Sequence, residues 1–250
     1  MGRLGWMLAL LASAPSVLAD SGQIACHNAN GLTGTVSASL PDPEAAGFDR
    51  QDCTLGSSAA QALGVGFAKG IAARGRDWTK LDGSGAALPD TAASWACLRD
   101  NESGLVWEIK TDDGGLRDKD HTYAWRSTDA SQNGGNSGPL GSDTCAGTLP
   151  AGQCNTEAYV AAVNAAGLCG ASDWRMPSIV ELDSLSDLGI NPRPAINPSL
   201  FPNSLSVAYW SATSRASNSN GAWVIVLDGG RREAVTKSGP AAIRLVRSSP

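Results

Sequence analysis

The chain has 250 residues, of which 42% are hydrophobic and 29 are glycine, and its formal net charge is −5 at pH 7. A mildly acidic chain is a poor general binder of nucleic acids or anionic membranes, so a site for a polyanion has to be a local basic patch. We therefore expect no nucleic-acid binding and no membrane insertion, and the glycine content predicts a protein rich in loops.

Residues 1–19 have the three-part layout of a secretory signal peptide. Arg3 precedes an apolar run at residues 4–11, and the segment ends in small and apolar residues that finish at Ala19. The apolar run is too short to span a bilayer. We expect cleavage after Ala19 and export of the remaining chain to the periplasm, the cell surface or the extracellular space.

Residues 20–93 are rich in small residues, including the alanine-glycine stretch at 57–75, and predict an irregular amino-terminal region with at most one weak helix. Two apolar runs follow, near residues 95–98 and 105–109, and the turn-forming sequence DNESG between them predicts two short strands. The next long segment, residues 127–153, is rich in Gly, Ser, Asn and Pro. A loop of this length inside a compact domain is functional, disordered or pinned.

Two helices are predicted after this loop. The sequence NTEAYVAAVNAAG has Asn155 or Thr156 as its cap and Gly167 as its stop. The second helix, SIVELDSLSDL, starts with a capping box formed by Ser178 and Glu181. The proline-rich segment after it excludes a further helix.

The carboxy-terminal residues 208–247 predict an antiparallel meander, built from AYWSAT, AWVIVLD, RREAVTK and AAIRLVR. The paired glycines Gly229 and Gly230 suit the positive φ angles of a tight hairpin turn. Because the strands are not interleaved with helices, the fold class is α+β, with two helices packed on a twisted antiparallel sheet.

Six cysteines lie in the exported part and none belongs to a CxxC motif, which favours disulfide bonds over a zinc site or a redox motif. A helix of about 12 residues between Cys154 and Cys169 would place their Cα atoms roughly 18 Å apart, well beyond the ~7 Å limit of a disulfide. We therefore favour a bond between Cys145 and Cys154, which would pin the long loop. The remaining pairs are assigned by elimination, Cys169 with Cys97 or another distant cysteine, and Cys26 with Cys53.

The ordered blocks DNESGLVWEIKT, NTEAYVAAVNAAGLCGASDWRMPSIVELDSL, FPN, YWSAT, AWVIVLDGG and IRLVR resemble the Lcl C-terminal domain family, and we assign residues 94–250 to this domain. WRMPSIVEL matches the family's WRLP followed by a helix with an EL pair. The resemblance implies a C-type-lectin-like fold on a secreted or surface-exposed protein. In the collagen-like bacterial adhesin that names the family, it implies binding of sulfated polysaccharides. This chain has no collagen-like repeats, and Leu245 stands where many members have a cysteine, so its cysteine pairing must differ from theirs.

The densest part of this resemblance, CGASDWRMPSIVEL, predicts a structural clamp and not a reactive site. Trp174 can fill the junction between the two helices and the sheet, and Pro177 sets the chain direction before the capped helix. Asp173 and Arg175 can pair with each other or with nearby backbone groups. Neither of them has an obvious catalytic partner.

The best candidate for polyanion binding is the basic cluster of the final strands, formed by Arg231, Arg232, Lys237, Arg244 and Arg247. Alternation with apolar residues predicts that Arg244 and Arg247 lie on the exposed face of a half-buried strand. Guanidinium groups suit sulfate or carboxylate groups. The alternative is that these basic residues only protect an exposed strand edge from aggregation.

The chain offers weaker candidates for a neutral sugar and for calcium. The EPN, QPD and WND motifs of calcium-dependent C-type lectins are absent. For a neutral sugar the candidate aromatic residues are Trp125 and Tyr123, although packing in the core is favoured. We predict no metal and no cofactor, since a solvated turn is the favoured reading of the best calcium candidate, the acidic run with Asp112, Asp113, Asp118 and Asp120.

Catalysis is disfavoured, because the only histidines are His27 and His121 and no GxSxG-type elbow is present. The leading hypothesis is an exported, disulfide-bonded, non-catalytic protein that binds a glycan or a sulfated polysaccharide at the cell surface, as an adhesin does. The alternative is a structural or interaction subunit of a surface or fimbrial assembly. An enzyme is the third choice.

Overall fold

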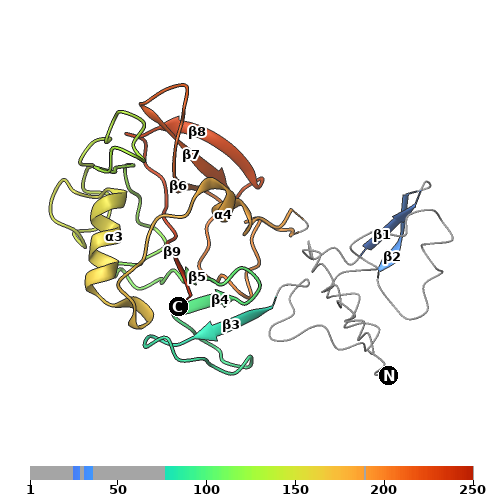
Figure 1. The fold of residues 1–250 in the computed structure, drawn as a ribbon. Coiled ribbons are helices and arrows are strands. Elements are labelled where there is room, and N and C mark those ends of the chain that lie inside the picture. The colour runs from blue at the N-terminus through green and yellow to red at the C-terminus, as the bar shows by residue number, and fades with distance from the viewer. Residues whose placement is uncertain (1–24, 29–30, 36–76, 189, 250) are drawn as a thin grey trace, which may run out of the picture. The chain divides into compact units, whose positions relative to one another are not determined.

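The structure is a computed structural model, and the chain in it splits into two compact units, Met1–Ala68 and Lys69–Pro250. Figure 1 draws the elements of both units along the chain. The residues that the structure describes are 25–28, 31–35, 77–188 and 190–249.

The described part of the first unit is one antiparallel pair of strands, β1 (Ala25–Asn28) and β2 (Gly31–Thr35). The predicted signal peptide, the alanine-glycine stretch and the pairing of Cys26 with Cys53 lie outside what the structure describes. They remain predictions from the sequence.

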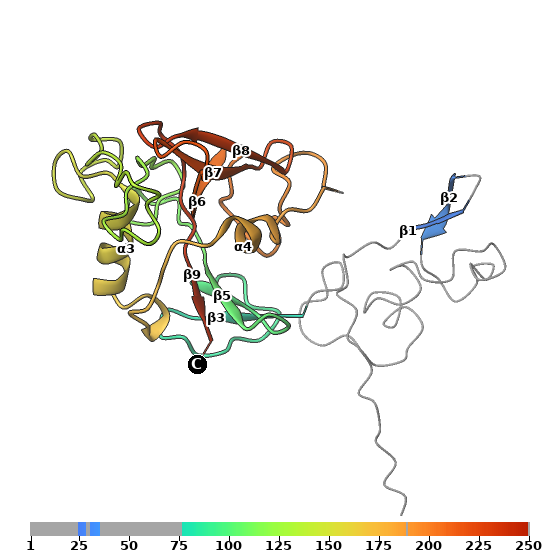
Figure 2. The same ribbon diagram turned by 45° about the horizontal axis from the view of Figure 1, so that its top comes forward.

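The second unit contains two antiparallel sheets, at opposite ends of the unit in both ribbon views (Figures 1 and 2). The three-stranded sheet has the order β6-β7-β8 of the predicted meander, with strands Ala208–Ser214, Gly221–Val226 and Arg231–Thr236. The other sheet has the order β3-β4-β5-β9, with strands Trp78–Leu81, Cys97–Asp100, Leu105–Glu108 and Val246–Ser248.

Strand β3 lies in the stretch 20–93 that was expected to be irregular. It pairs along its whole length with β4, from Trp78 opposite Asp100 to Leu81 opposite Cys97. The second unit therefore includes residues that precede Ser94.

In the described residues of this unit the sheets are accompanied by two α-helices, so the α+β class is confirmed, although the described strands form two sheets where one was expected. Helix α3 (Thr156–Ala165) is capped by Asn155, and Gly167 follows it with a left-handed φ of 65°. The short helix α4 (Ile179–Asp183) has both hydrogen bonds of the predicted capping box and packs against β6 and β7.

The terminal segment, residues 241–248, does not extend the meander beside β8. Ala242 bridges to Tyr209 of β6, and β9 then pairs with β5, so the segment joins the two sheets. Residues 241–246 are all buried because protein covers them on both sides. Alternate side chains of a strand point to opposite faces, so every second side chain reaches solvent only where one face is uncovered. The expected exposure of Arg244 is therefore wrong, since this residue is 1% exposed.

A buried carboxylate holds this segment in place. Glu108, at the end of β5, is fully buried. It accepts hydrogen bonds from the Tyr159 hydroxyl, from Lys110 Nζ at 3.4 Å and from the backbone N–H of Leu245 at 2.9 Å. Arg244 donates to the carbonyl oxygen of the same residue at 2.7 Å. One residue thus connects β5, α3 and the terminal segment.

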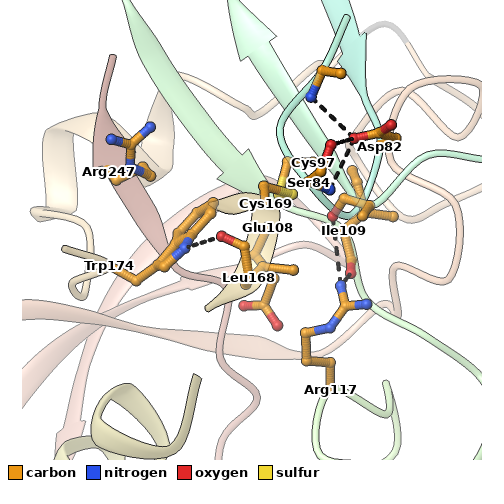
Figure 3. Close-up of a disulfide and its surroundings, with 12 residues drawn as sticks. Asp82, Ser84, Cys97, Glu108, Ile109, Arg117, Leu168, Cys169, Trp174 and Arg247 are labelled. Atoms are coloured by element: carbon orange, nitrogen blue, oxygen red, sulfur yellow. Dashed lines mark hydrogen bonds between the residues drawn. A yellow bond between two sulfur atoms is a disulfide. The ribbon is translucent and has the colours of Figure 1, made fainter. Parts of the chain in front are cut away.

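The favoured disulfide is confirmed, and Cys169 takes Cys97 from the partners that the sequence left open. Cys145–Cys154 closes the end of the long loop, with Cα atoms 5.7 Å apart. Cys97–Cys169 joins β4 to a 3-10 turn at Leu168–Gly170, with Cα atoms 6.5 Å apart (Figure 3). These bonds fit an oxidising compartment.

The predicted clamp is seen around Trp174, which is 2% exposed. Its indole N–H donates to the carbonyl of Leu168 at 2.9 Å, as Figure 3 shows, and its backbone N–H donates to Asn164 Oδ1 at 2.8 Å. The next residue, Arg175, exchanges two backbone hydrogen bonds with Val246. The clamp therefore ties α3 and the following turn to β9.

Asp173 and Arg175, on either side of Trp174, do not pair with each other. Arg247 donates to Asp173 at 2.6 Å, whereas Arg175 donates twice to Glu181, at 2.8 and 2.7 Å. Both side chains serve the clamp through other partners.

Replacing Glu108 with Gln should lower the free energy of unfolding by about 3 kcal/mol, because it leaves the buried ammonium of Lys110 without its carboxylate. The matched surface change Glu233→Gln should cost less than about 1 kcal/mol, since its partner Arg231 is exposed. Urea unfolding measures both values. The double variant Glu108→Gln/Lys110→Met should be more stable than Glu108→Gln alone, because it has no unpaired buried ammonium. If Glu108→Gln is as stable as the wild type, the Glu108 carboxylate does not hold the terminal segment in place.

Candidate ligand-binding groove

The two arginines that follow the hairpin turn lie beside carboxylates. Arg231 donates to Asp228 at 2.8 Å and to Glu233 at 2.6 Å. Arg232 donates to Asp183 at the end of α4. Their positive charges are therefore locally compensated, which weakens the attraction of this hairpin for a polyanion.

Lys237, the third member of the predicted basic cluster, is 2% exposed. Its ammonium donates to the carbonyls of Asn133 and Asn136, both at 2.6 Å, and lies 4.1 Å from the ring centre of Trp125. Burial lowers the pKa of this lysine. The side chain fixes the long loop from inside.

The last two members of the cluster are also engaged. Arg244 lies over the ring of Phe201 and donates to Ser204 at 2.7 Å as well as to the backbone of Glu108. Arg247 donates to Asp173. The five cations thus do not form one free surface, because two are buried and three are paired.

The acidic run was the calcium candidate. Oxygens of Asp112, Asp118 and Asp120 lie within 4.8 Å of one another, and Asp113 is not part of this group. Lys119 Nζ donates to Asp112 at 2.7 Å and to Asp120 at 2.9 Å. The chain's own ammonium thus lies where a cation would have to bind.

Asp118, the buried member of that run, accepts backbone N–H groups. The donors are Asp120 at 2.9 Å, Gly114 at 2.7 Å and Asp113 at 2.8 Å. These bonds lower the pKa of Asp118 to about 2. The carboxylate organises a turn, and Asp118 itself is buried in it where the sequence predicted a solvated turn.

Two open surface depressions that share Gln132 and Ala212 lie by the start of α3, the long loop and the end of β6, and we treat them as the two lobes of one groove. The first lobe holds about 200 Å³ and the second about 470 Å³. Residues of the first lobe are Trp125, Arg126, Ser127, Gln132, Thr156, Glu157, Val160, Arg175, Met176 and Ala212. Residues of the second lobe are Ser131, Gln132, Gly134, Ala212, Thr213, Ser214, Arg215 and Ala216.

Two ion pairs involve arginines that line the first lobe. Glu157, in the first turn of α3, accepts from Arg126 at 3.2 Å and from the backbone N–H and hydroxyl of Thr128. Burial alone would raise the pKa of Glu157, but the bonds from Thr128 and the charge of Arg126 lower it overall. The second pair joins Arg175 to Glu181, which lies outside the lining, and the bonds from Arg175 hold the pKa of Glu181 below its usual value.

The aromatic candidates for a neutral sugar are core residues. Trp125 forms part of the groove floor but is 2% exposed, and its indole N–H donates to the carbonyl of Ser211 at 2.8 Å. Tyr123 is fully buried. Neither ring offers a free face to a ligand, so the core reading is confirmed.

The loop that forms the rim of both lobes is held by the rest of the unit. Ser214 Oγ donates to the carbonyl of Gln132 at 2.7 Å, and the hydroxyl of Thr156 donates to the carbonyl of Arg126 at 2.7 Å. Together with Lys237, these bonds give the groove a shape that exists before a ligand binds.

Sequence reasoning missed the groove as a site. Its lining comes from four separate segments, residues 125–134, 156–160, 175–176 and 212–216. The one available signal was the length of the loop at 127–153, because a long loop inside a compact domain is often functional.

Stability should fall as the pH drops from about 4 to about 2, because Asp118 has a pKa of about 2 in the folded chain and ~3.9 when unfolded. A carboxyl group whose pKa is lower in the folded chain stabilises the fold at pH values above its unfolded pKa. Protonation of the folded chain at lower pH removes that contribution. Asp118→Asn lacks this carboxylate, so its stability should not show this loss. The difference in unfolding free energy between the wild type and Asp118→Asn should therefore shrink as the pH falls from about 4 to about 2. Thermal melts in a pH series measure this difference, and a difference independent of pH would contradict the assignment.

None of the helices in the described part of the chain has the length and apolar character that a membrane crossing requires.

Comparison with known proteins places the chain in a family. Among curated proteins and solved structures, none matches the chain. The family model of the Lcl C-terminal domain matches residues 96–247, which is more than half of the chain. The chain therefore belongs to the Lcl C-terminal domain family.

Proposed function

We propose that the chain is an exported, non-catalytic binding protein with a C-type-lectin-like domain, which recognises a glycan in the two-lobed groove. Membership of the Lcl C-terminal domain family supports a surface-associated role. The two disulfides and the signal-like residues 1–19 support export to the periplasm, the cell surface or the medium.

The observation that carries the proposal is the lining of the groove. Ser127 and Gln132 offer a hydroxyl and an amide group, which both donate and accept hydrogen bonds, as sugar hydroxyls do. The Ser214 hydroxyl already donates to the carbonyl of Gln132, so it can only accept a further bond. Val160 and Met176 add apolar surface against which the C–H groups of a sugar ring can pack. A concave site with apolar surface and a few fixed polar groups is the usual form of a small-ligand site.

The chemistry of the groove favours binding over catalysis. Its lining, as the structure describes it, contains neither histidine nor cysteine. Its one carboxylate, Glu157, has a lowered pKa and is held by Arg126 and Thr128. A general acid or base works best with a pKa near the working pH, so this carboxylate is poorly placed for such a role.

The groove is also a better glycan site than the final hairpin. Arg231 and Arg232 are each paired with a carboxylate, so a sulfate group would have to compete with Asp228, Glu233 and Asp183. We therefore assign glycan binding to the groove, and sulfated polysaccharides remain one class of ligand to test there.

A subunit of a surface assembly is the second candidate, and exposed apolar side chains favour it. Val180 on α4 and Leu188 just after it are each 66% exposed. Contiguous exposed apolar patches often mark contacts with protein partners, and these two side chains are where such a contact would be tested.

Filling the groove tests the proposal. Ala212 lines both lobes, so Ala212→Trp should weaken binding to glycans of a printed array by tenfold or more, or about 1.4 kcal/mol. The double variant Arg231→Ala/Arg232→Ala should bind as the wild type does. Unchanged thermal melting of each variant shows that it is folded.

The opposite pattern would contradict the proposal. If the hairpin variant loses binding while Ala212→Trp keeps it, the ligand lies on the hairpin. If the wild type binds no glycan and instead co-purifies with a protein partner that Val180→Ser/Leu188→Ser releases, the second candidate is correct.

A further inference from the structure

The two lobes of the groove differ in charge, and we infer that they bind successive units of one linear chain, an uncharged unit in the first lobe and a unit with an anionic group in the second. This inference rests on the proposed function. It narrows the ligand class to a polymer in which charged and uncharged units alternate.

The first lobe is electrically balanced. Each of its guanidinium groups is matched by a carboxylate, Arg126 by Glu157 at 3.2 Å and Arg175 by Glu181 at 2.7 Å. An anionic group placed here would have to displace a carboxylate that already occupies the donors. A uronate or a sulfated unit is therefore disfavoured in this lobe, whereas an uncharged unit can use the remaining hydroxyl and amide groups.

The second lobe has a cation without such a match. Arg215 is exposed, and its Nε donates to Ser217 Oγ at 3.0 Å. Within the described residues, no carboxylate forms an ion pair with Arg215. The terminal nitrogens of a guanidinium are suited to bind a carboxylate or a sulfate with two parallel bonds.

Asp129 lies on the loop whose residues 131, 132 and 134 line the second lobe, and within the described residues it forms no ion pair with Arg215. Asp129 accepts from the hydroxyl and the backbone N–H of Ser131 and from the side chain of Gln132. Hydrogen bonds from Ser131 hold the pKa of Asp129 below its usual value. The carboxylate keeps its negative charge, but these bonds hold it within the loop, and the Arg215 guanidinium keeps no carboxylate partner among the described residues.

The groove can accept the interior of a chain and not only its end. The lobes meet at Gln132 and Ala212, which line both, and neither lobe is an enclosed cavity. Their spacing is preset, because Ser214 at the end of β6 is bonded to the backbone of Gln132. A linear chain can therefore enter at one lobe and leave at the other.

The test uses hyaluronan fragments, in which a uronate alternates with an uncharged N-acetylhexosamine, and the same fragments after reduction of their carboxylates. Titration calorimetry should show that the wild type binds the charged fragments about threefold to tenfold more tightly than the reduced ones. Arg215→Ala should abolish this ratio by weakening only the charged fragments. The matched control is Arg193→Ala, because Arg193 is exposed and forms no ion pair within the described residues, but lies outside the groove.

The outcomes separate this inference from the proposed function. An equal affinity for charged and reduced fragments, or the same ratio in Arg215→Ala as in the wild type, would overturn the inference and leave glycan binding intact. A polygalacturonate fragment, with a carboxylate on every unit, should bind more weakly than hyaluronan, and tighter binding would also overturn it. Failure of every fragment to bind, with no effect of Ala212→Trp on an array, would overturn the proposed function itself.

Discussion

The fold depends on the buried carboxylate of Glu108. An unpaired charge in a protein interior costs several kcal/mol, so this side chain is stable only while its partners are in place. Tyr159 comes from α3, Lys110 follows β5, and the N–H of Leu245 belongs to the terminal segment. Burial lowers the pKa of Lys110, and the charge of Glu108 opposes that shift. Satisfying one carboxylate thus fixes three parts of the chain that are far apart in sequence.

The groove inherits its shape from this arrangement. The start of α3 forms one wall, and the backbone of Arg175 is bonded to Val246 of the same terminal segment. Cations then hold the loops, since an ammonium or guanidinium group can donate to several carbonyls at once. Lys80 and Lys237 each donate to two loop carbonyls, and Arg117 donates to the carbonyl of Ile109, as Figure 3 shows. A unit with few strands keeps long loops in one conformation by this means.

Local features of the fold could be predicted from the sequence. The cap at Asn155 and the capping box of α4 depend on residues three positions apart, and the bond between Cys145 and Cys154 followed from the length of the intervening helix to Cys169. The exposure of Arg244 could not be predicted, because it depends on what covers the second face of its segment. The groove could not be predicted either, since Arg215 and the other lining residues converge only after folding, and the charge of an arginine says nothing about whether a carboxylate will lie beside it.

The central claim is that the ligand occupies the groove, and amide chemical shifts test it most directly. Titrating hyaluronan fragments into isotopically labelled protein should shift the amide signals of residues 126, 127, 131, 132, 134 and 212–216, which line the two lobes. Signals of residues 228–236, in the final hairpin, should stay unchanged. Shifts confined to the hairpin, with the groove signals unmoved, would contradict the account.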